Sequence, residues 1–221
     1  MSNMSNEINE EKEVSKMLKV LNWAYNTVET GFTGFDSVEG LAKSYGNNGE
    51  NPIDQVNSLI RWQNTKAGTS GFIAGLGGLI TMPVTIPANF ASVLLIQIRM
   101  IAAIAYIGGY DLKDDQVKTL VYVSLCGSAA KEILKNAGIQ LGTKLTVSMI
   151  QKYLTAEILK QINKAVGFRL ITKAGSTGVI NVGKAVPLIG GLIGGSFDLF
   201  TTNIIGNTAR DIFIVGNHSI K

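Results

Sequence analysis

Few residues of this chain have the type and spacing that catalysis or metal binding requires. Residues 178–184 have the glycine and lysine spacing of a phosphate-binding loop, but Ala185 stands where a serine or threonine would bind magnesium. The single histidine, His218, lies in a polar C-terminal segment, and the single cysteine, Cys126, lies in an apolar run. A nucleophile needs a neighbouring base, and a zinc site needs several Cys or His ligands. The sequence therefore predicts a protein that is not an enzyme and that binds no metal or cofactor.

The distribution of charge points to anionic partners. The net charge is +4, but residues 1–50 hold eight acidic and four basic side chains, whereas residues 113–184 hold eleven basic and four acidic ones. Such a basic field favours membrane headgroups or nucleic acid, and nucleic acid is not expected because the lysines are dispersed and no nucleic-acid-binding motif accompanies them. A set of merely solvated helix faces is the alternative. The residues expected to bind lipid or another anion are Lys144, Lys152, Lys160, Lys164, Arg169 and Lys173.

Apolar residues repeat with helical period along most of the chain, and no segment shows the alternation of a strand. The expected amphipathic helices cover residues 9–31, 35–46, 52–68, 114–138 and 143–166. No linker-like stretch separates two cores. We therefore predict an all-α, single-domain helical bundle over residues 10–215, with polar tails at 1–9 and 216–221.

Two stretches, residues 71–110 and 186–214, are apolar around nearly the whole helix surface. Small residues stand four apart in both, a spacing that lets helix backbones approach closely. The expected close-packing positions are Gly71, Gly75, Gly190 and Gly194. Such helices are typical of the centre of a large bundle or of contact with lipid. We expect two glycine-rich helical hairpins that are either packed in the core or able to insert into a bilayer.

Each apolar stretch contains one charge near its middle, Arg99 and Asp198. In residues 88–107, nine strongly apolar side chains contribute about −4 kcal/mol to membrane insertion, and Arg99 alone costs about 2.5 to 3.5 kcal/mol. An isolated charge would be costly in a bilayer and in a protein core. We therefore predict that Arg99 and Asp198 face each other between the two stretches. The alternative is that both reach solvent at the edge of the bundle.

The motifs of the two apolar stretches resemble those of a known family. They are Gly75-Leu76-Gly77-Gly78 followed by Gln97-Ile98-Arg99, and Gly190-Gly191-Leu192 followed by Ser196-Phe197-Asp198. In this combination they resemble the EcsC protein family of bacteria, over roughly residues 10–215. The resemblance implies a fold class and places Arg99 and Asp198 in matching motif blocks. It implies no settled activity, and its name, taken from a gene beside an ABC transporter, points only weakly to a transporter.

These observations predict a non-catalytic, cytoplasmic protein, because the N-terminus carries no secretory signal. We expect it to associate with the inner face of the membrane by binding anionic lipid or a membrane protein. Three alternatives stay open. The protein could permeabilise membranes as a stress or defence effector, serve a membrane transporter as an accessory protein, or carry an apolar ligand in solution.

Overall fold

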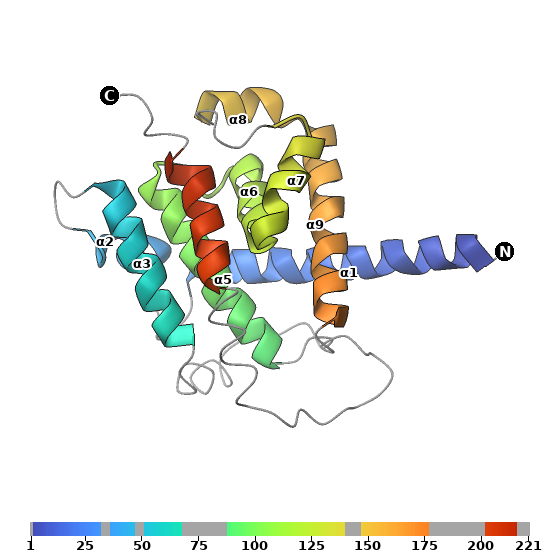
Figure 1. Ribbon diagram of the computed structural model, residues 1–221, viewed down its shortest axis with the longest axis horizontal. Coiled ribbons are helices and arrows are strands. Elements are labelled where there is room, and N and C mark those ends of the chain that lie inside the picture. The colour runs from blue at the N-terminus through green and yellow to red at the C-terminus, as the bar shows by residue number, and fades with distance from the viewer. Residues whose placement is uncertain are drawn as a thin grey trace.

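The computed structural model describes residues 2–31, 36–46, 51–67, 88–139, 147–176 and 202–215, and every regular element within these ranges is helical (Figure 1). This confirms the all-α class. The elements are α1 (Ser2–Thr30), α2 (Val38–Lys43), α3 (Pro52–Ala67), α5 (Ala88–Ile107), α6 (Asp115–Leu125), the short 3-10 helix η1 (Gly127–Ala129), α7 (Ala130–Asn136), α8 (Val147–Tyr153) and α9 (Ala156–Ser176). Residues 202–210 form a further helix, which ends in a π-helical turn, η2 (Asp211–Val215).

The apolar helix α5 forms the centre of the bundle. It contacts α1, α2, α3, α6 and η2, and Figure 1 shows it in the middle of the molecule. Ile98, Ile101 and Ile104 are completely buried there. A helix that is apolar all round needs apolar neighbours on every side, and the surrounding helices provide them. Among the described helices, none combines the length and the hydropathy needed to cross a membrane.

The long helix α1 lies across α5 and α9. Its amphipathic face buries Val14, Leu21 and Val28, as the helical period predicts. It ends as expected before Gly31, whose φ of 77° suits glycine. The helix begins at Ser2 rather than at Asn9, however, so the expected N-terminal tail is mostly helical and projects beyond the body of the bundle in Figure 1.

Two helices that we predicted to be continuous are interrupted. The helix expected over residues 114–138 breaks between α6 and α7, where Gly127 has a φ of 56° and a Cβ atom would lie 3.0 Å from Ile204 Cγ2. The helix expected over residues 143–166 breaks between α8 and α9, where the Thr155 hydroxyl accepts a hydrogen bond from the Ile158 amide at 3.4 Å. Leu154 is buried at that break. Contact with a distant helix therefore accompanies the first break, whereas a local hydrogen bond accompanies the second.

Four helix ends lie on one side of the bundle. The C-terminal ends of α3 and α9 and the N-terminal ends of α5 and helix 202–210 all lie at the lower side of Figure 1. We call this side the junction end, because the chain passes there into and out of residues 68–87 and 177–201. Gly71, Gly75, Gly190, Gly194 and Asp198 belong to those two segments and lie outside the described residues. The glycine-rich hairpins therefore stay a prediction.

Candidate functional site

The outer face of α9 brings basic side chains together with an exposed aromatic ring. Ile162 and Val166 are buried on the inner side of this helix. Gly167 faces α1, since a Cβ atom there would lie 2.9 Å from Val14 Cγ1. On the side of α9 that points away from Ile162 and Val166, Lys160, Lys164 and Phe168 stand at four-residue spacing and face solvent, and the exposed Arg169 follows Phe168 in the sequence. Phe168 is 46% exposed, although phenylalanine is usually buried.

The basic residues predicted to bind anions do not all lie together in the structure. Lys160 and Arg169 lie on the same helix, about 14 Å apart along its axis at the usual helical rise. Lys152 is exposed on α8, at the opposite end of the bundle from the junction end, with its Nζ 5.7 Å from the centre of the Tyr153 ring (Figure 1). Lys144 and the side chain of Lys173 lie outside the described residues. The described part of the set is therefore centred on α9.

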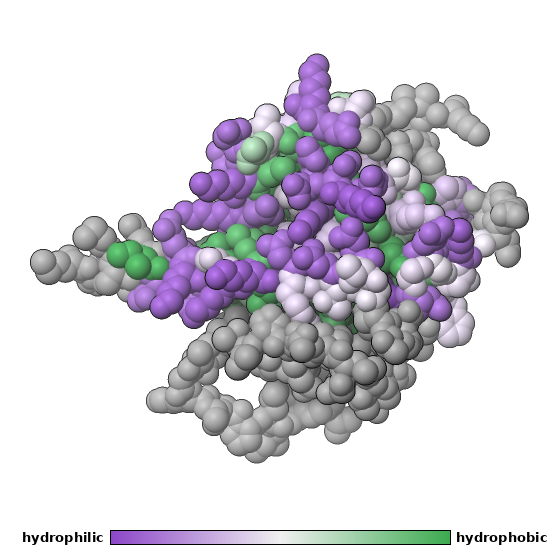
Figure 2. Space-filling model, turned by 180° about the vertical axis from the view of Figure 1, so that it is seen from behind, coloured by the Kyte–Doolittle hydropathy of each residue, from purple (hydrophilic) through white to green (hydrophobic). Residues whose placement is uncertain are grey.

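One acidic side chain of α1 reaches this basic face. Lys164 Nζ lies 3.0 Å from Glu11 Oε1, and both side chains are mostly exposed. An exposed pair of this kind contributes little to stability because water and salt screen it. It does, however, neutralise part of the positive charge on the outer face of α9. Seen from behind, the described surface is mostly hydrophilic, and apolar side chains reach it only in small areas (Figure 2).

Arg99 is buried on α5, with 7% of its surface exposed. Its Nη2 donates a hydrogen bond to the main-chain carbonyl of Asp36 at 2.8 Å. Burial lowers the pKa of Arg99, and the nearby Asp36 carboxylate opposes this effect. Asp36 is a partner that the sequence did not indicate. Asp198 lies outside the described residues, so the Arg99–Asp198 pair stays a prediction.

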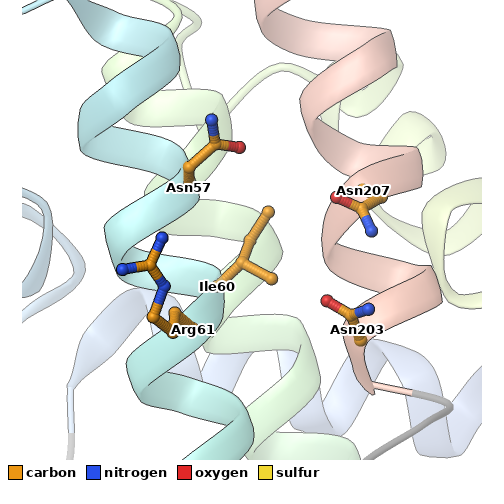
Figure 3. A pocket seen from close by; sticks show the side chains of 5 residues that line it. All are labelled: Asn57, Ile60, Arg61, Asn203 and Asn207. Carbon is orange, nitrogen blue, oxygen red and sulfur yellow. The ribbon is translucent and has the colours of Figure 1, made fainter.

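A pocket of about 280 Å³ lies between α3 and helix 202–210 (Figure 3). Gly206 allows the two helices to approach, since a Cβ atom there would lie 2.8 Å from Ile60 Cγ1. The pocket is lined by Asn57, Ile60, Arg61, Asn203 and Asn207. The sequence did not indicate this pocket. Its only signal is a polar residue at four-residue spacing on each helix, at 57 and 61 and again at 203 and 207.

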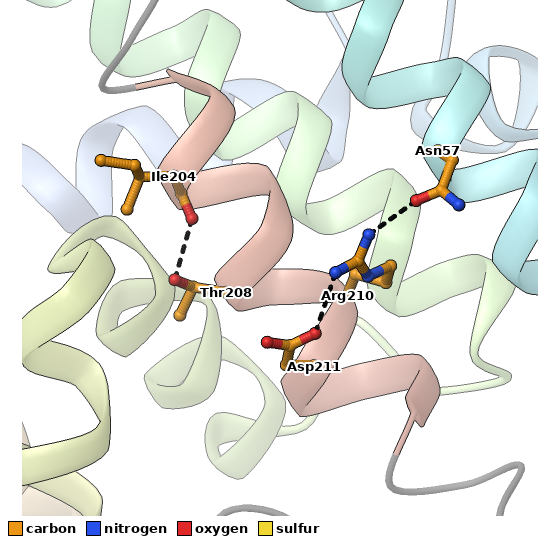
Figure 4. Close-up of polar contacts among 5 residues, drawn as sticks. All are labelled: Asn57, Ile204, Thr208, Arg210 and Asp211. Carbon is orange, nitrogen blue, oxygen red and sulfur yellow. Dashed lines mark hydrogen bonds and ion pairs between the residues drawn. The ribbon is translucent and has the colours of Figure 1, made fainter.

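Arg210 joins the two walls of this pocket region. Its Nη1 donates to Asn57 Oδ1 at 2.7 Å, and its Nη2 donates to Asp211 Oδ1 at 3.3 Å (Figure 4). The arrangement holds α3 against helix 202–210 through a charge-assisted hydrogen bond. Three of the five lining residues are asparagines, whose amides can donate or accept hydrogen bonds but supply no strong nucleophile or base.

Residues that could do catalytic or metal chemistry are sparse in the described part of the chain. Within it, no cluster of three or more His, Cys, Asp or Glu side chains could hold a metal ion. Cys126 is buried at the end of α6. Residues 178–185, with their partial phosphate-loop spacing, and His218 lie outside the described residues.

The family of the chain follows from its similarity to a known family model. The model of the EcsC protein family matches residues 50–215, three quarters of the chain. The chain belongs to the EcsC protein family. No curated protein and no solved structure matches it. In this EcsC family member the matched region runs from α3 to η2, so it includes α5, α9 and the pocket. It leaves out α1, which supplies Glu11.

Proposed function

We propose that this EcsC family member is a non-catalytic protein that associates peripherally with an anionic membrane surface, at the cytoplasmic face, through the outer face of α9. The observation that supports this most is the alignment of Lys160, Lys164 and Phe168 on one exposed side of the helix, with the exposed Arg169 next to Phe168 in the sequence. Cations attract anionic headgroups, and an exposed aromatic ring partitions into the interface.

The expected affinity is moderate. Each lysine or arginine near an anionic surface contributes about 1 kcal/mol, so three cations contribute about 3 kcal/mol. This corresponds to an increase in binding of about a hundredfold. The contribution falls within a Debye length, which is about 8 Å at physiological ionic strength. Binding should therefore weaken strongly as salt is added.

Flotation with vesicles tests the proposal. The wild-type protein should float with phosphatidylglycerol vesicles at low salt, much less at high salt, and not with phosphatidylcholine vesicles. The variant K160Q/K164Q should lose about 2 kcal/mol and bind phosphatidylglycerol vesicles about thirtyfold more weakly. The control K43Q/K113Q removes the same charge from exposed lysines on other elements, and it should bind nearly as well as the wild type. An equal loss in both variants would contradict binding through α9.

Other outcomes of the same assay favour the alternatives. Flotation that resists high salt would favour insertion of the glycine-rich stretches, and leakage of an entrapped dye would then favour a permeabilising effector. No flotation in any condition would remove the lipid-binding proposal and favour binding of a membrane protein such as a transporter. Apolar lipid retained by the purified protein without vesicles would favour a carrier.

A further inference from the structure

We propose that the pocket between α3 and helix 202–210 binds a small soluble molecule through a carboxylate or phosphate group, with Arg61 as the principal contact. This site goes beyond the proposed function and does not depend on it. The pocket lies beside α3, whereas α9 contacts α1, α6 and α7 on the other side of the bundle (Figure 1). A solute can therefore enter the pocket while α9 is bound to a bilayer.

The pocket has one wall on each of two helices. The α3 wall carries Asn57 and Arg61, and the opposite wall carries Asn203 and Asn207. Figure 3 shows the two pairs on neighbouring helices, with Ile60 between them. Ile60 is buried, so it offers an apolar contact beside the amides and the guanidinium. A ligand in this pocket can therefore pack against an apolar side chain and form hydrogen bonds to both walls.

The described lining of the pocket carries positive and no negative charge. Arg61 is the charged residue among the five described residues that line it. A second guanidinium lies at the edge of the pocket, where Arg210 Nη1 donates to Asn57 Oδ1 at 2.7 Å. Both guanidinium groups repel a cationic ligand and attract an anionic one. The electrostatics of the pocket therefore favour an anion.

Two carboxylates on the same helices lie outside this lining. Asp211 Oδ1 accepts a hydrogen bond from Arg210 Nη2 at 3.3 Å (Figure 4). Asp54 is exposed and precedes Arg61 by seven residues, which is about 10 Å along α3 at the usual helical rise. Water and salt screen exposed charges at such a distance, since the Debye length is about 8 Å at physiological ionic strength. Neither carboxylate therefore cancels the charge of Arg61.

The hydrogen-bonding groups of the two walls suit an oxyanion. A guanidinium presents a planar fork of N–H donors that matches two oxygens of a carboxylate or a phosphate. An asparagine amide supplies two further N–H donors, and Asn203 and Asn207 carry such amides on the wall opposite Arg61 (Figure 3). Donors from both helices can therefore share the oxygens of one ligand group.

The volume of the pocket limits the size of the ligand. Sites for drug-sized ligands usually enclose about 300 to 1,000 Å³. This pocket measures about 280 Å³, so a nucleotide or an acyl chain would extend beyond it. We therefore expect a molecule of a few carbon atoms that carries one carboxylate or phosphate group.

Nuclear magnetic resonance of the isotope-labelled full chain tests the site with inorganic phosphate and with acetate. Either probe should shift the side-chain amide signals of Asn203 and Asn207 more than sodium chloride does at the same ionic strength. The shifts should saturate with a dissociation constant on the order of 1 mM, because so small a ligand makes few contacts. Glycerol, a neutral probe of similar size, should cause no such shift.

Three variants locate the binding. Arg61→Gln should weaken binding of both anions at least about tenfold, because hydrogen bonds between charged partners are stronger than neutral ones. Asn207→Leu keeps the net charge but removes an amide from the pocket, and it should weaken binding as read from the Asn203 signal. The matched control Arg169→Gln removes a guanidinium from an exposed position on α9 and should leave the shifts unchanged. Circular dichroism verifies that each variant folds.

Several outcomes would overturn this site. They are the absence of a saturable shift with both anions, shifts that persist in Arg61→Gln, and equal losses in Arg61→Gln and Arg169→Gln. A shift with glycerol alone would overturn the anionic class of the ligand. If Arg61→Gln weakened flotation with vesicles as much as K160Q/K164Q does, the anion would be a lipid headgroup rather than a soluble molecule. Anion-induced shifts in a protein that does not float would support this site and remove the proposed function.

Discussion

The two ends of the bundle differ in the side chains that fill the space between the helices. At the end opposite the junction, the rings of Tyr110 and Phe213 meet edge to face at 5.2 Å, and a Cβ atom at Gly108 would lie 2.6 Å from the Phe213 carbonyl oxygen. Towards the junction end, buried polar side chains enter the interior, among them Gln97 and Thr202, which are hydrogen bonded at 3.2 Å. Apolar side chains are tightly packed at the end opposite the junction end. Towards the junction end, where the chain continues into residues 68–87 and 177–201, buried polar side chains take their place.

The largest effect should come from the tightly packed end. Phe213 is completely buried, so Phe213→Ala should lower the free energy of unfolding by about 3 to 5 kcal/mol through lost burial and an unfilled cavity. Val215→Ala, at an exposed position two residues later, is the control and should change stability little. Urea denaturation followed by circular dichroism measures both. A loss below about 1 kcal/mol for Phe213→Ala would show that this end is not closely packed.

Reversing the buried charge on α5 should have the next largest effect. Arg99→Asp places a carboxylate in a buried site beside Asp36, and we expect a loss of about 3 kcal/mol. Arg99→Met should cost less, because it leaves no unpaired buried charge. If Arg99 also faces Asp198, the double variant R99D/D198R should be more stable than either single variant. A double variant no more stable than its parents would reject that pair.

A smaller effect should come from the polar interior towards the junction end. Gln97→Ala and Thr202→Ala should each lower the free energy of unfolding by about 1 kcal/mol, because each leaves a buried partner without its hydrogen bond. The double variant should cost less than the sum of the two. A double-mutant cycle from denaturation curves measures this coupling. Strict additivity would show that the two side chains do not stabilise each other.

Alkaline pH should loosen the tightly packed end. Burial raises the pKa of Tyr110 to about 12, above its ordinary value of 10.0. The folded state then holds the phenolic proton more tightly than the unfolded state, so stability falls as pH rises above about 10 and through about 12. Tyr110→Phe should lose less stability over this window than the wild type. Equal slopes of unfolding free energy against pH in the two proteins would contradict this.

The smallest effect should concern the outer face of α9. Glu11→Gln removes the carboxylate beside Lys164 and should strengthen flotation with anionic vesicles by about twofold, since exposed pairs are weak. Glu39→Gln breaks the comparable exposed pair with Lys43 on α2, away from α9, and should leave flotation unchanged. Equal gains in both variants would indicate a general charge effect rather than a local one.

Features that depend on a few neighbouring residues could be predicted from the sequence. The start of α3 follows from Asn51 and Pro52, and Asn51 Oδ1 accepts a hydrogen bond from the Ile53 amide at 3.0 Å. The end of α7 follows from Gly138, which has a φ of 80°. A helix cap is a local arrangement of one turn, so its signal lies within a few residues of the sequence.

Features that depend on distant segments could not be predicted. The break at Gly127 brings Ile204 close to it, and the pocket joins Asn57 and Arg61 to residues almost 150 positions later. Each helix shows only a short polar stripe by itself. Nothing within either stripe indicates which other stripe it will face, because that choice depends on the packing of the whole bundle.

The sequence by itself determined the helical class, the family and the excess of basic residues on one part of the chain. The sequence left two possible environments for α5, a protein core or lipid, because hydropathy measures only how strongly a surface avoids water. The tertiary structure places α5 in the core, where α1, α2, α3 and α6 contact it and Ile98 and Ile101 are buried. It also decided that Trp62 and Phe168 are among the exposed aromatic residues, because exposure depends on which neighbouring helices cover a given face.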